Sequence, residues 1–193
     1  MSRIVVDSIR NSSASSDALT LSSDGKVAFP NNTGNILQVV QAVKTDATST
    51  STAVYGGISG LQPSITPSST SNKILITVDL KIGFSDTGAD LNLQLFRSVG
   101  GTETQICLGD ASSNRTRTFF GGQNSGHSDT TSVVPVSTLF LDSPNTTSAV
   151  TYLVKWRVER GGTYIYINRS GLDTDNSTYF RAVSSVTLME VAA

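Results

Sequence analysis

Residue types that enzyme and metal sites depend on are nearly missing from this chain. Its 193 residues include one cysteine, Cys107, and one histidine, His127. A single cysteine excludes an internal disulfide, and a catalytic thiolate would need a neighbouring base that only one histidine could supply. Cys107 lies in residues 105–108, a short apolar stretch, and we expect it to be a small buried hydrophobic residue on a strand.

Charged side chains are also scarce. Asp, Glu, Lys and Arg make up 15% of the chain, and the formal net charge is -1. Nucleic-acid binding needs clustered Lys and Arg to neutralise phosphates, so nucleic acid is not an expected partner. No apolar run approaches the ~20 residues of a membrane-spanning helix, and residues 1–10 lack the apolar stretch of a signal peptide. We therefore expect synthesis in a cytoplasm and no membrane insertion.

What the chain does contain is the pattern of β-strands. Between positions 74 and 84 every second residue is apolar, whereas the residues between them are mostly polar or glycine. Side chains alternate between the two faces of a strand, so this spacing predicts a strand over residues 73–84 with one face in a core. The alternating apolar residues are Ile74, Ile76, Val78, Leu80, Ile82 and Phe84. Trp156, in the alternating stretch 150–159, is likewise expected to be in the core.

Two pairs of glycines punctuate the strands. Gly100-Gly101 and Gly161-Gly162 are predicted to be two-residue hairpin turns, because such turns need positive φ angles. The second turn would join residues 150–159 to residues 163–168. About ten to twelve strands with frequent turn signals predict an all-β protein, an antiparallel β-sandwich or jelly roll.

Residues 163–168 (TYIYIN) carry large side chains at alternate positions on both faces. Tyr164 and Tyr166 alternate with Ile165 and Ile167. Such a strand is either covered on both faces, by its own chain or by a neighbouring subunit, or it exposes its tyrosines to water.

The first 35 residues differ from the rest. Short strand fragments are separated there by turn residues and cannot form a core alone. We predict an extended N-terminal arm over residues 1–35, which becomes ordered by pairing with sister chains or by attachment to a larger assembly, and a head domain over residues 36–193. The alternative is a disordered leader. An apolar patch favours the arm, and its candidate anchoring residues are Ile4, Val5, Val6 and Ile9.

Two glycine- and serine-rich segments, residues 109–131 and 171–177, are predicted to be loops. The first is about 20 residues long, and loops of that length within a compact domain are usually functional or mobile. The candidate surface-recognition residues on them are Phe119, Phe120, Asn124, His127, Asp173 and Asp175.

None of these residues forms a recognisable catalytic, cofactor-binding or metal-binding motif. Residues 173–176 (DTDN) begin like a calcium-binding loop, but Thr178 stands where glycine is needed and Ser184 stands where a bidentate carboxylate is needed. The chain has no G-x-S-x-G motif, and its carboxylates are scattered over turns. We expect no cofactor and no enzymatic activity; a small carbohydrate-active enzyme is the alternative from another functional class.

Three segments carry a resemblance to a known group of proteins. They are residues 36–45 (ILQVVQAVKT), 61–80 (LQPSITPSSTSNKILITVDL) and 179–191 (YFRAVSSVTLMEV). Together they resemble a module of virion structural proteins of tailed bacteriophages, especially marine and cyanobacterial phages. Similar modules form the heads of tail fibres and other surface projections, as trimeric β-sandwich or jelly-roll domains.

The resemblance implies a non-enzymatic virion protein. It would be a homotrimeric fibre or fibre-tip subunit that contacts other tail or capsid proteins through its arm and binds a host-surface glycan or protein through its head. The alternative within the same class is a capsid decoration or cement protein that stabilises the head shell.

Overall fold

The computed structural model describes residues 6–10, 12, 13, 15–21, 23, 27, 28, 34–123 and 130–193, and it is all-β over these residues. No helix long and apolar enough to cross a membrane occurs among them. The strands are β1 (Ser8–Ile9), β2 (Leu19–Leu21), β3 (Val27–Ala28), β4 (Ile36–Lys44), β5 (Thr48–Thr50), β6 (Gly56–Gly57), β7 (Ser64–Ile65), β8 (Lys73–Phe84), β9 (Asp90–Val99), β10 (Thr102–Ile106), β11 (Phe120–Gln123), β12 (Val134–Asp142), β13 (Val150–Val158), β14 (Ile165–Ile167) and β15 (Ser184–Val191).

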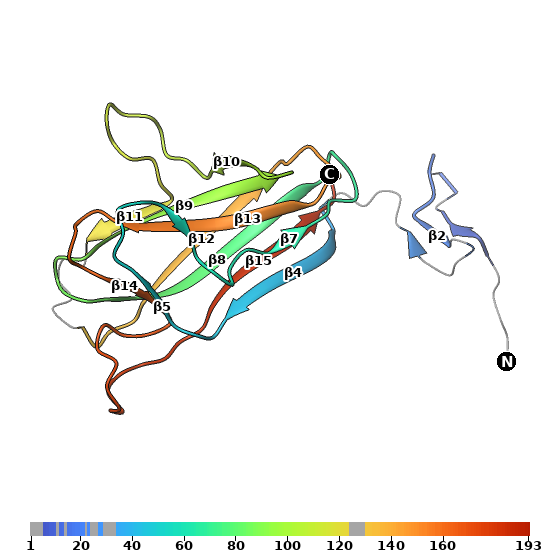
Figure 1. The fold of residues 1–193 in the computed structure, drawn as a ribbon. Coiled ribbons are helices and arrows are strands. Elements are labelled where there is room, and N and C mark those ends of the chain that lie inside the picture. Colours follow the sequence, from blue (N-terminus) through green and yellow to red (C-terminus); the bar gives the residue numbers. More distant parts are fainter. Residues whose placement is uncertain are drawn as a thin grey trace.

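Two antiparallel sheets pack face to face (Figure 1). In the first sheet, β12 pairs with one edge of β8, β15 and β14 share its other edge, and β4 and β5 lie outermost. In the second sheet, β10 and β11 share one edge of β9, β13 takes the other, and β6 and β7 follow on β13. Each sheet therefore has four strand positions.

The chain order through these positions is that of a jelly roll. Strands that share one position in a sheet are counted together, which gives eight positions along the chain. The first sheet contains the first (β4 and β5), third (β8), sixth (β12) and eighth (β14 and β15) of these positions, and the second sheet contains the other four. The first and last positions, β4 and β15, are neighbours, as in two wrapped Greek keys. The predicted sandwich or jelly roll is confirmed.

The core lies between the sheets and follows the alternation in the sequence. On β8, Ile74, Ile76 and Leu80 are all 0% exposed, as the pattern predicted. On β13, the burial alternates through the whole strand, and Trp156 is 5% exposed. Removing side chains of this size from water contributes roughly 1.5–3 kcal/mol each, so the two inner faces stabilise the fold.

One predicted hairpin is confirmed and the other is wrong. Gly100 and Gly101 have φ of 57° and 85° and join β9 to β10, as expected of a turn with two positive φ angles. After β13, however, the chain crosses to the first sheet, where β14 pairs with β5 and β8. A Gly-Gly pair lets the chain reverse direction but does not determine which strand the next segment pairs with. Here Ile165 and Ile167, both 0% exposed, are buried on the first sheet.

The tyrosine face of β14 is open to solvent in part. Tyr164 is 46% exposed and Tyr166 is half-buried. The two rings stack with centroids 6.2 Å apart, and the Arg169 guanidinium lies 3.6 Å from the Tyr166 ring centroid. The cation covers one of the rings, so this face is neither fully buried nor fully solvated.

The segment predicted to be a single loop over residues 109–131 contains a strand. β11 pairs with β9 next to the end of β10, so the excursion from the sheet spans residues 107–119 (Figure 1). Cys107 begins this excursion with φ of 54° and is half-buried against the core, so the expectation of a buried strand residue is wrong. The reversal of the chain at this point ends the strand before Cys107.

Strands β1, β2 and β3 form a small antiparallel sheet that pairs with neither large sheet within the described part of the chain. Of the candidate anchoring residues, Val6 is 41% exposed and Ile9 is 57% exposed, whereas Ile4 and Val5 lie outside the described residues. The head begins beside the C-terminus: the backbone N–H of Gly34 donates to the carbonyl of Ala192 over 2.8 Å. The division at residue 35 stays a prediction.

Candidate functional site

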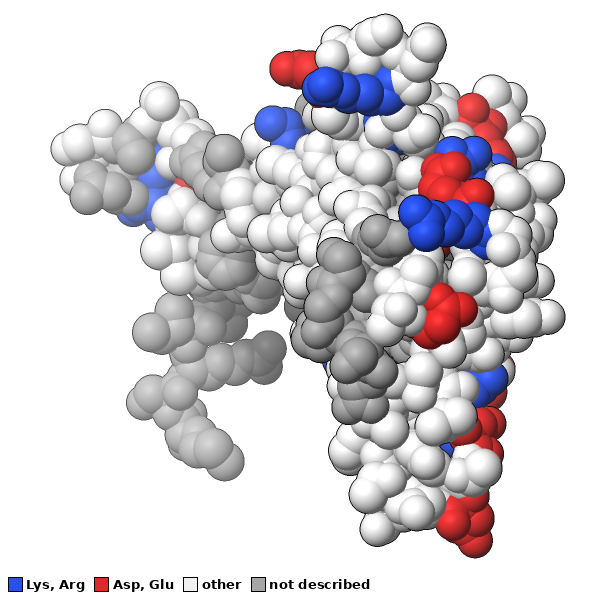
Figure 2. Space-filling model, turned by 90° about the vertical axis from the view of Figure 1, so that its left-hand side faces the viewer, with Lys and Arg blue, Asp and Glu red and all other residues white. Residues whose placement is uncertain are grey.

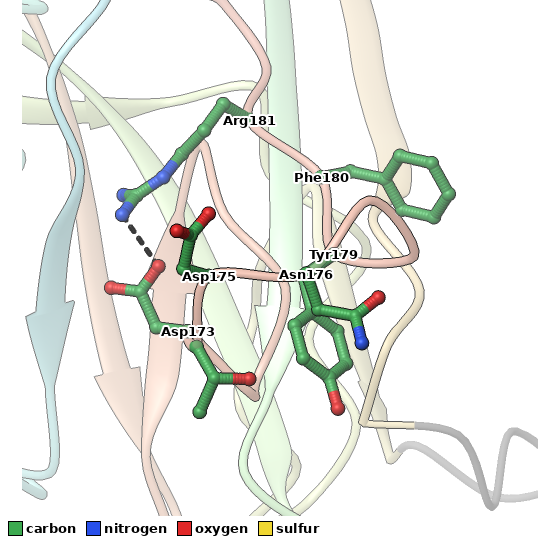
Figure 3. Close-up of a pocket in the computed structure, with 7 residues that line it drawn as sticks. Asp173, Asp175, Asn176, Tyr179, Phe180 and Arg181 are labelled. Carbon is green, nitrogen blue, oxygen red and sulfur yellow. Dashed lines mark hydrogen bonds and ion pairs between the residues drawn. The ribbon is translucent and has the colours of Figure 1, made fainter.

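A shallow hollow of about 350 Å³ lies on the loop between β14 and β15 (Figure 3). It contains both carboxylates that the sequence analysis singled out in this loop. Asp173 is ion-paired with Arg181 and lies 3.8 Å from Arg169 Nε. The residues lining the hollow are Asp173, Thr174, Asp175, Asn176, Tyr179, Phe180 and Arg181.

The hollow offers hydrogen-bonding groups and aromatic rings. Phe180 is 54% exposed, and in Figure 3 its ring points away from the ion pair between Asp173 and Arg181. No group of three or more His, Cys, Asp or Glu side chains lies together among the residues that the structure describes. Such a surface suits a polar ligand such as a sugar, held by hydrogen bonds and contacts with a ring.

The loop is held in one conformation by its own side chains. Asn176 Oδ1 accepts hydrogen bonds from the backbone N–H and the hydroxyl of Thr178, at 3.0 and 2.9 Å. At the base of the loop, a Cβ on Gly171 would lie 2.0 Å from the carbonyl oxygen of Phe84. Only glycine fits there, so the loop starts pressed against the backbone of β8.

The other candidate residues are elsewhere. Phe119 and Phe120 are half-buried and pack against the core, so they do not line the hollow. Asn124 and His127 lie outside the described residues. The hollow also contains three residues that were not predicted from the sequence: Tyr179, Phe180 and Arg181. Adjacent aromatic and cationic residues in a turn-rich segment could have indicated a binding surface.

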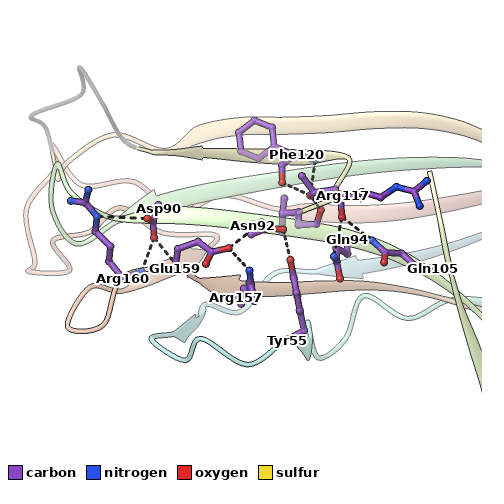
Figure 4. A network of polar contacts seen from close by, with 12 residues as sticks. Tyr55, Asp90, Asn92, Gln94, Gln105, Arg117, Phe120, Arg157, Glu159 and Arg160 are labelled. Carbon is purple, nitrogen blue, oxygen red and sulfur yellow. Dashed lines mark hydrogen bonds and ion pairs between the residues drawn. The ribbon is translucent and has the colours of Figure 1, made fainter. Parts of the chain in front are cut away.

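The outer face of the second sheet carries a network of polar side chains (Figure 4). Tyr55 donates from its hydroxyl to Asn92 Oδ1 over 2.5 Å, and Asn92 Nδ2 donates to Glu159 Oε1 over 3.3 Å. Arg157 pairs with Glu159, and its guanidinium lies 4.5 Å from the Tyr55 ring centroid. Burial raises the pKa of Tyr55.

The same face is tied to the loop after β10. Gln94 Nε2 and Gln105 Nε2 each donate to the carbonyl of Arg117 over 3.0 Å, and Arg117 Nε donates to the carbonyl of Gly109 over 2.6 Å. These groups satisfy one another, so the network holds loop and sheet together. Figure 2 shows Lys and Arg in small groups beside Asp and Glu on the side that it presents, with no field of one sign.

Two buried carboxylates lie inside the sandwich. Asp142 is 6% exposed and accepts hydrogen bonds from Tyr152 at 2.8 Å and from Arg97 at 3.0 and 3.1 Å. Burial and the neighbouring Asp142 carboxylate raise the pKa of Tyr152 far above its ordinary value. Because Asp142 comes from the first sheet and its two donors come from the second, this cluster ties the sheets together.

The second buried carboxylate, Glu190, is 0% exposed near the end of β15. Its Oε1 accepts from the backbone N–H of Ser68 at 2.6 Å, from the Ser68 hydroxyl at 2.8 Å and from Asn72 Nδ2 at 2.6 Å. Its Oε2 accepts from Gln38 Nε2 at 2.5 Å. Burial raises its pKa, but the hydrogen bonds from Gln38, Asn72 and Ser68 outweigh burial, and the pKa is lowered. Both buried carboxylates are saturated with donors, as expected of structural groups.

Comparison with known proteins gives similarities at the level of structure. No protein family and no curated protein sequence matches this chain. Among solved structures, the VP2 subviral particle of infectious bursal disease virus is similar over 86% of this chain and 44% of its own, at 13% identity and a TM-score of 0.35.

Two further structures of the same virus are similar to the same extent. The Gx strain structure gives 13% identity, a TM-score of 0.36 and coverage of 90% of this chain and 41% of its own. The T=1 particles give 12% identity, a TM-score of 0.36 and coverage of 87% and 39%. The chain thus spans less than half the length of each of these three structures.

Proposed function

We propose that this protein is a non-enzymatic bacteriophage virion protein, a trimeric fibre or fibre-tip subunit. Residues 1–35 attach it to other virion proteins, and the jelly-roll head faces outward. The observation that carries this proposal is the jelly-roll order of the two sheets, in a chain whose segments 36–45, 61–80 and 179–191 resemble phage virion modules. Jelly rolls recur in viral capsid and lectin domains. One fold occurs in proteins of many functions, so the assignment to phage virion proteins rests on these three segments together with the fold.

The head binds a host-surface glycan or protein through its loops. Residues 171–181 form a well-defined surface, because Gly171 holds the start of the loop against β8 and the Asn176 hydrogen bonds to Thr178 hold its turn. Loops on a rigid scaffold suit variable recognition. The hollow is shallow, so a single contact would be weak; several copies on one particle would multiply it by avidity.

The absence of enzymatic activity is part of the proposal. The buried polar groups around Asp142 and Glu190 are engaged in bonds that join strands, and they face the interior rather than an open cleft. The carboxylates of the hollow, Asp173 and Asp175, are both exposed, and Asp173 is neutralised by Arg181. Both carboxylates are open to water, whereas the general acid of a glycoside hydrolase lies in a largely apolar pocket.

A capsid decoration protein is the second candidate. Exposed apolar side chains on and next to the small N-terminal sheet favour it, because a clamp between shell subunits would bury them. They include Val6, Ile9, Leu21 and Val27, which are 41%, 57%, 40% and 50% exposed.

The recognition proposal is tested by binding of the labelled full-length chain to an array of bacterial lipopolysaccharides and capsular polysaccharides. We expect binding to a subset of them, and a loss of at least tenfold in affinity for Phe180→Ala. Val54→Ala is the matched control, because Val54 is 74% exposed and does not line the hollow. Equal binding by the two variants would refute the assignment to residues 171–181, and no binding at all would refute glycan recognition.

A further inference from the structure

We infer that copies of this chain associate through the outer face of the first sheet. This inference rests on the trimeric state in the proposed function and names the surface that would produce it. We call this surface the association face and define it by six outward residues on β4, β8, β12 and β15. They are Val39, Leu75, Leu139, Leu141, Met189 and Val191.

The strand register aligns four of these residues in one row. Leu141 is paired with Leu75, Leu75 with Met189, and Met189 with Val39. The row therefore crosses the whole sheet, with neighbouring strands about 4.8 Å apart. Its members alternate with core residues such as Ile74 and Ile76, so they point away from the core.

The row is open to solvent, most of all at the two edges of the sheet. Val39 on β4 is 58% exposed and Leu141 on β12 is 45% exposed, and Leu139 in the next row is 64% exposed. Within the described residues, β4 pairs only with β15 and β12 pairs only with β8, so the outer edge of each strand has no partner strand. Unpaired edges with apolar side chains favour association with another chain.

The whole outer face of the first sheet approaches the size of a protein interface. Four strands about 4.8 Å apart and a length of residues 73–81 at about 3.4 Å per residue give roughly 19 Å by 27 Å, or about 500 Å² in projection. Side chains make the accessible area larger than this projection. A standard interface buries about 800 Å² on each partner, so the outer face of the sheet would supply much of that area, with the association face as its apolar part.

The chemistry of the face selects another copy of the chain as its partner. The face has charges of both signs on β8: exposed Lys73 lies at one end, and Asp79, ion-paired with Lys81, lies at the other. A membrane or nucleic acid would require an excess of cations, and a glycan would require exposed aromatic rings, which the six residues lack. A mixed face with an apolar centre is complementary to itself.

A three-fold arrangement covers both edges of the row. The β12 side of the face on one copy would meet the β4 side on the next, so each exposed edge would find an apolar partner. The second sheet cannot serve in the same way, because its outer face is occupied by the network around Asn92, Gln94 and Arg157.

The test is the solution mass of the full-length chain, measured by light scattering over a series of concentrations. We expect the wild type to be a trimer and the double variant Val39→Glu with Leu139→Glu to dissociate, with a dissociation constant at least tenfold higher. Val54→Glu and Val39→Glu alone are compared as single-charge variants, and Val54→Glu is the control because its position is exposed and outside the face. Circular dichroism verifies that each variant is folded.

Each outcome decides the inference. A double variant as trimeric as the wild type overturns the association face and leaves the proposed trimer standing. A monomeric wild type overturns both. If the glutamate variants do not fold, Val39→Thr with Leu139→Thr replaces them, because threonine keeps the strand propensity while adding a polar group; this pair should again raise the dissociation constant, and an unchanged value overturns the inference.

Discussion

Replacing the buried Glu190 with glutamine should destabilise the head more than the same carboxylate-to-amide change at an exposed surface residue. Glu190 is 0% exposed, and its carboxylate accepts hydrogen bonds from Ser68, Asn72 and Gln38. These bonds join β15 and β4 to the loop before β8, so the charge holds together segments far apart in the sequence.

The expected cost of Glu190→Gln is about 2–4 kcal/mol at pH 7. A hydrogen bond to a charged group contributes about 1.5–3 kcal/mol, against about 0.5–1.5 kcal/mol for a neutral one. Glutamine removes the charge from every bond and places an amide NH₂ where one carboxylate oxygen accepts from Gln38. Domains of this kind have total stabilities of about 5–15 kcal/mol, so the loss is large but leaves a folded protein to measure.

The effect should depend on pH in a defined direction. The lowered pKa of Glu190 means that the folded state holds the ionised form more tightly than the unfolded chain does. Its contribution is fully present above the ordinary glutamate pKa of about 4.3 and is lost as the pH falls through the lowered folded value. The difference between the wild type and Glu190→Gln should therefore shrink in acid.

The assay is urea unfolding of both proteins at equal protomer concentration, at pH 7 and at several acidic values. Equal concentration matters because association adds to apparent stability. Glu103→Gln is the control: Glu103 pairs with Lys155 on the surface, and such pairs contribute about 0–1 kcal/mol. A loss below about 1 kcal/mol at pH 7, or a difference that does not change with pH, would refute the reasoning.

Two further substitutions test the packing of the sandwich. Gly171→Ala should lower the free energy of unfolding by more than about 3 kcal/mol or prevent folding, because its Cβ would lie 2.0 Å from the Phe84 carbonyl oxygen. Gly161→Ala is the control and should be near neutral in thermal unfolding, because a Cβ at Gly161 meets nothing within 4 Å. Tyr152→Phe should cost about 1–2 kcal/mol in urea unfolding, because Asp142 loses one of its buried donors and keeps the other; no loss would contradict the role of this hydroxyl in joining the sheets.

The candidate site was only partly predictable. Asp173 and Asp175 were identified because turn residues and carboxylates cluster there in the sequence, and both line the hollow. Phe119 and Phe120 were expected on an open loop but pack against the core, because β11 returns the chain to β9. A pair of adjacent phenylalanines has the same local appearance in a loop and at the start of a strand, and only the partner strand separates the two.

The sequence by itself determined the long alternating strands and which of their faces are buried. Alternation along β8 and the turn at Gly100-Gly101 are local properties, and physical chemistry over a few residues is enough to specify them. Only the tertiary structure decided which strands are neighbours. The crossing to β14 and the row from Leu141 to Val39 depend on contacts between residues far apart in the chain, and the alternating pattern of each strand is compatible with many partners.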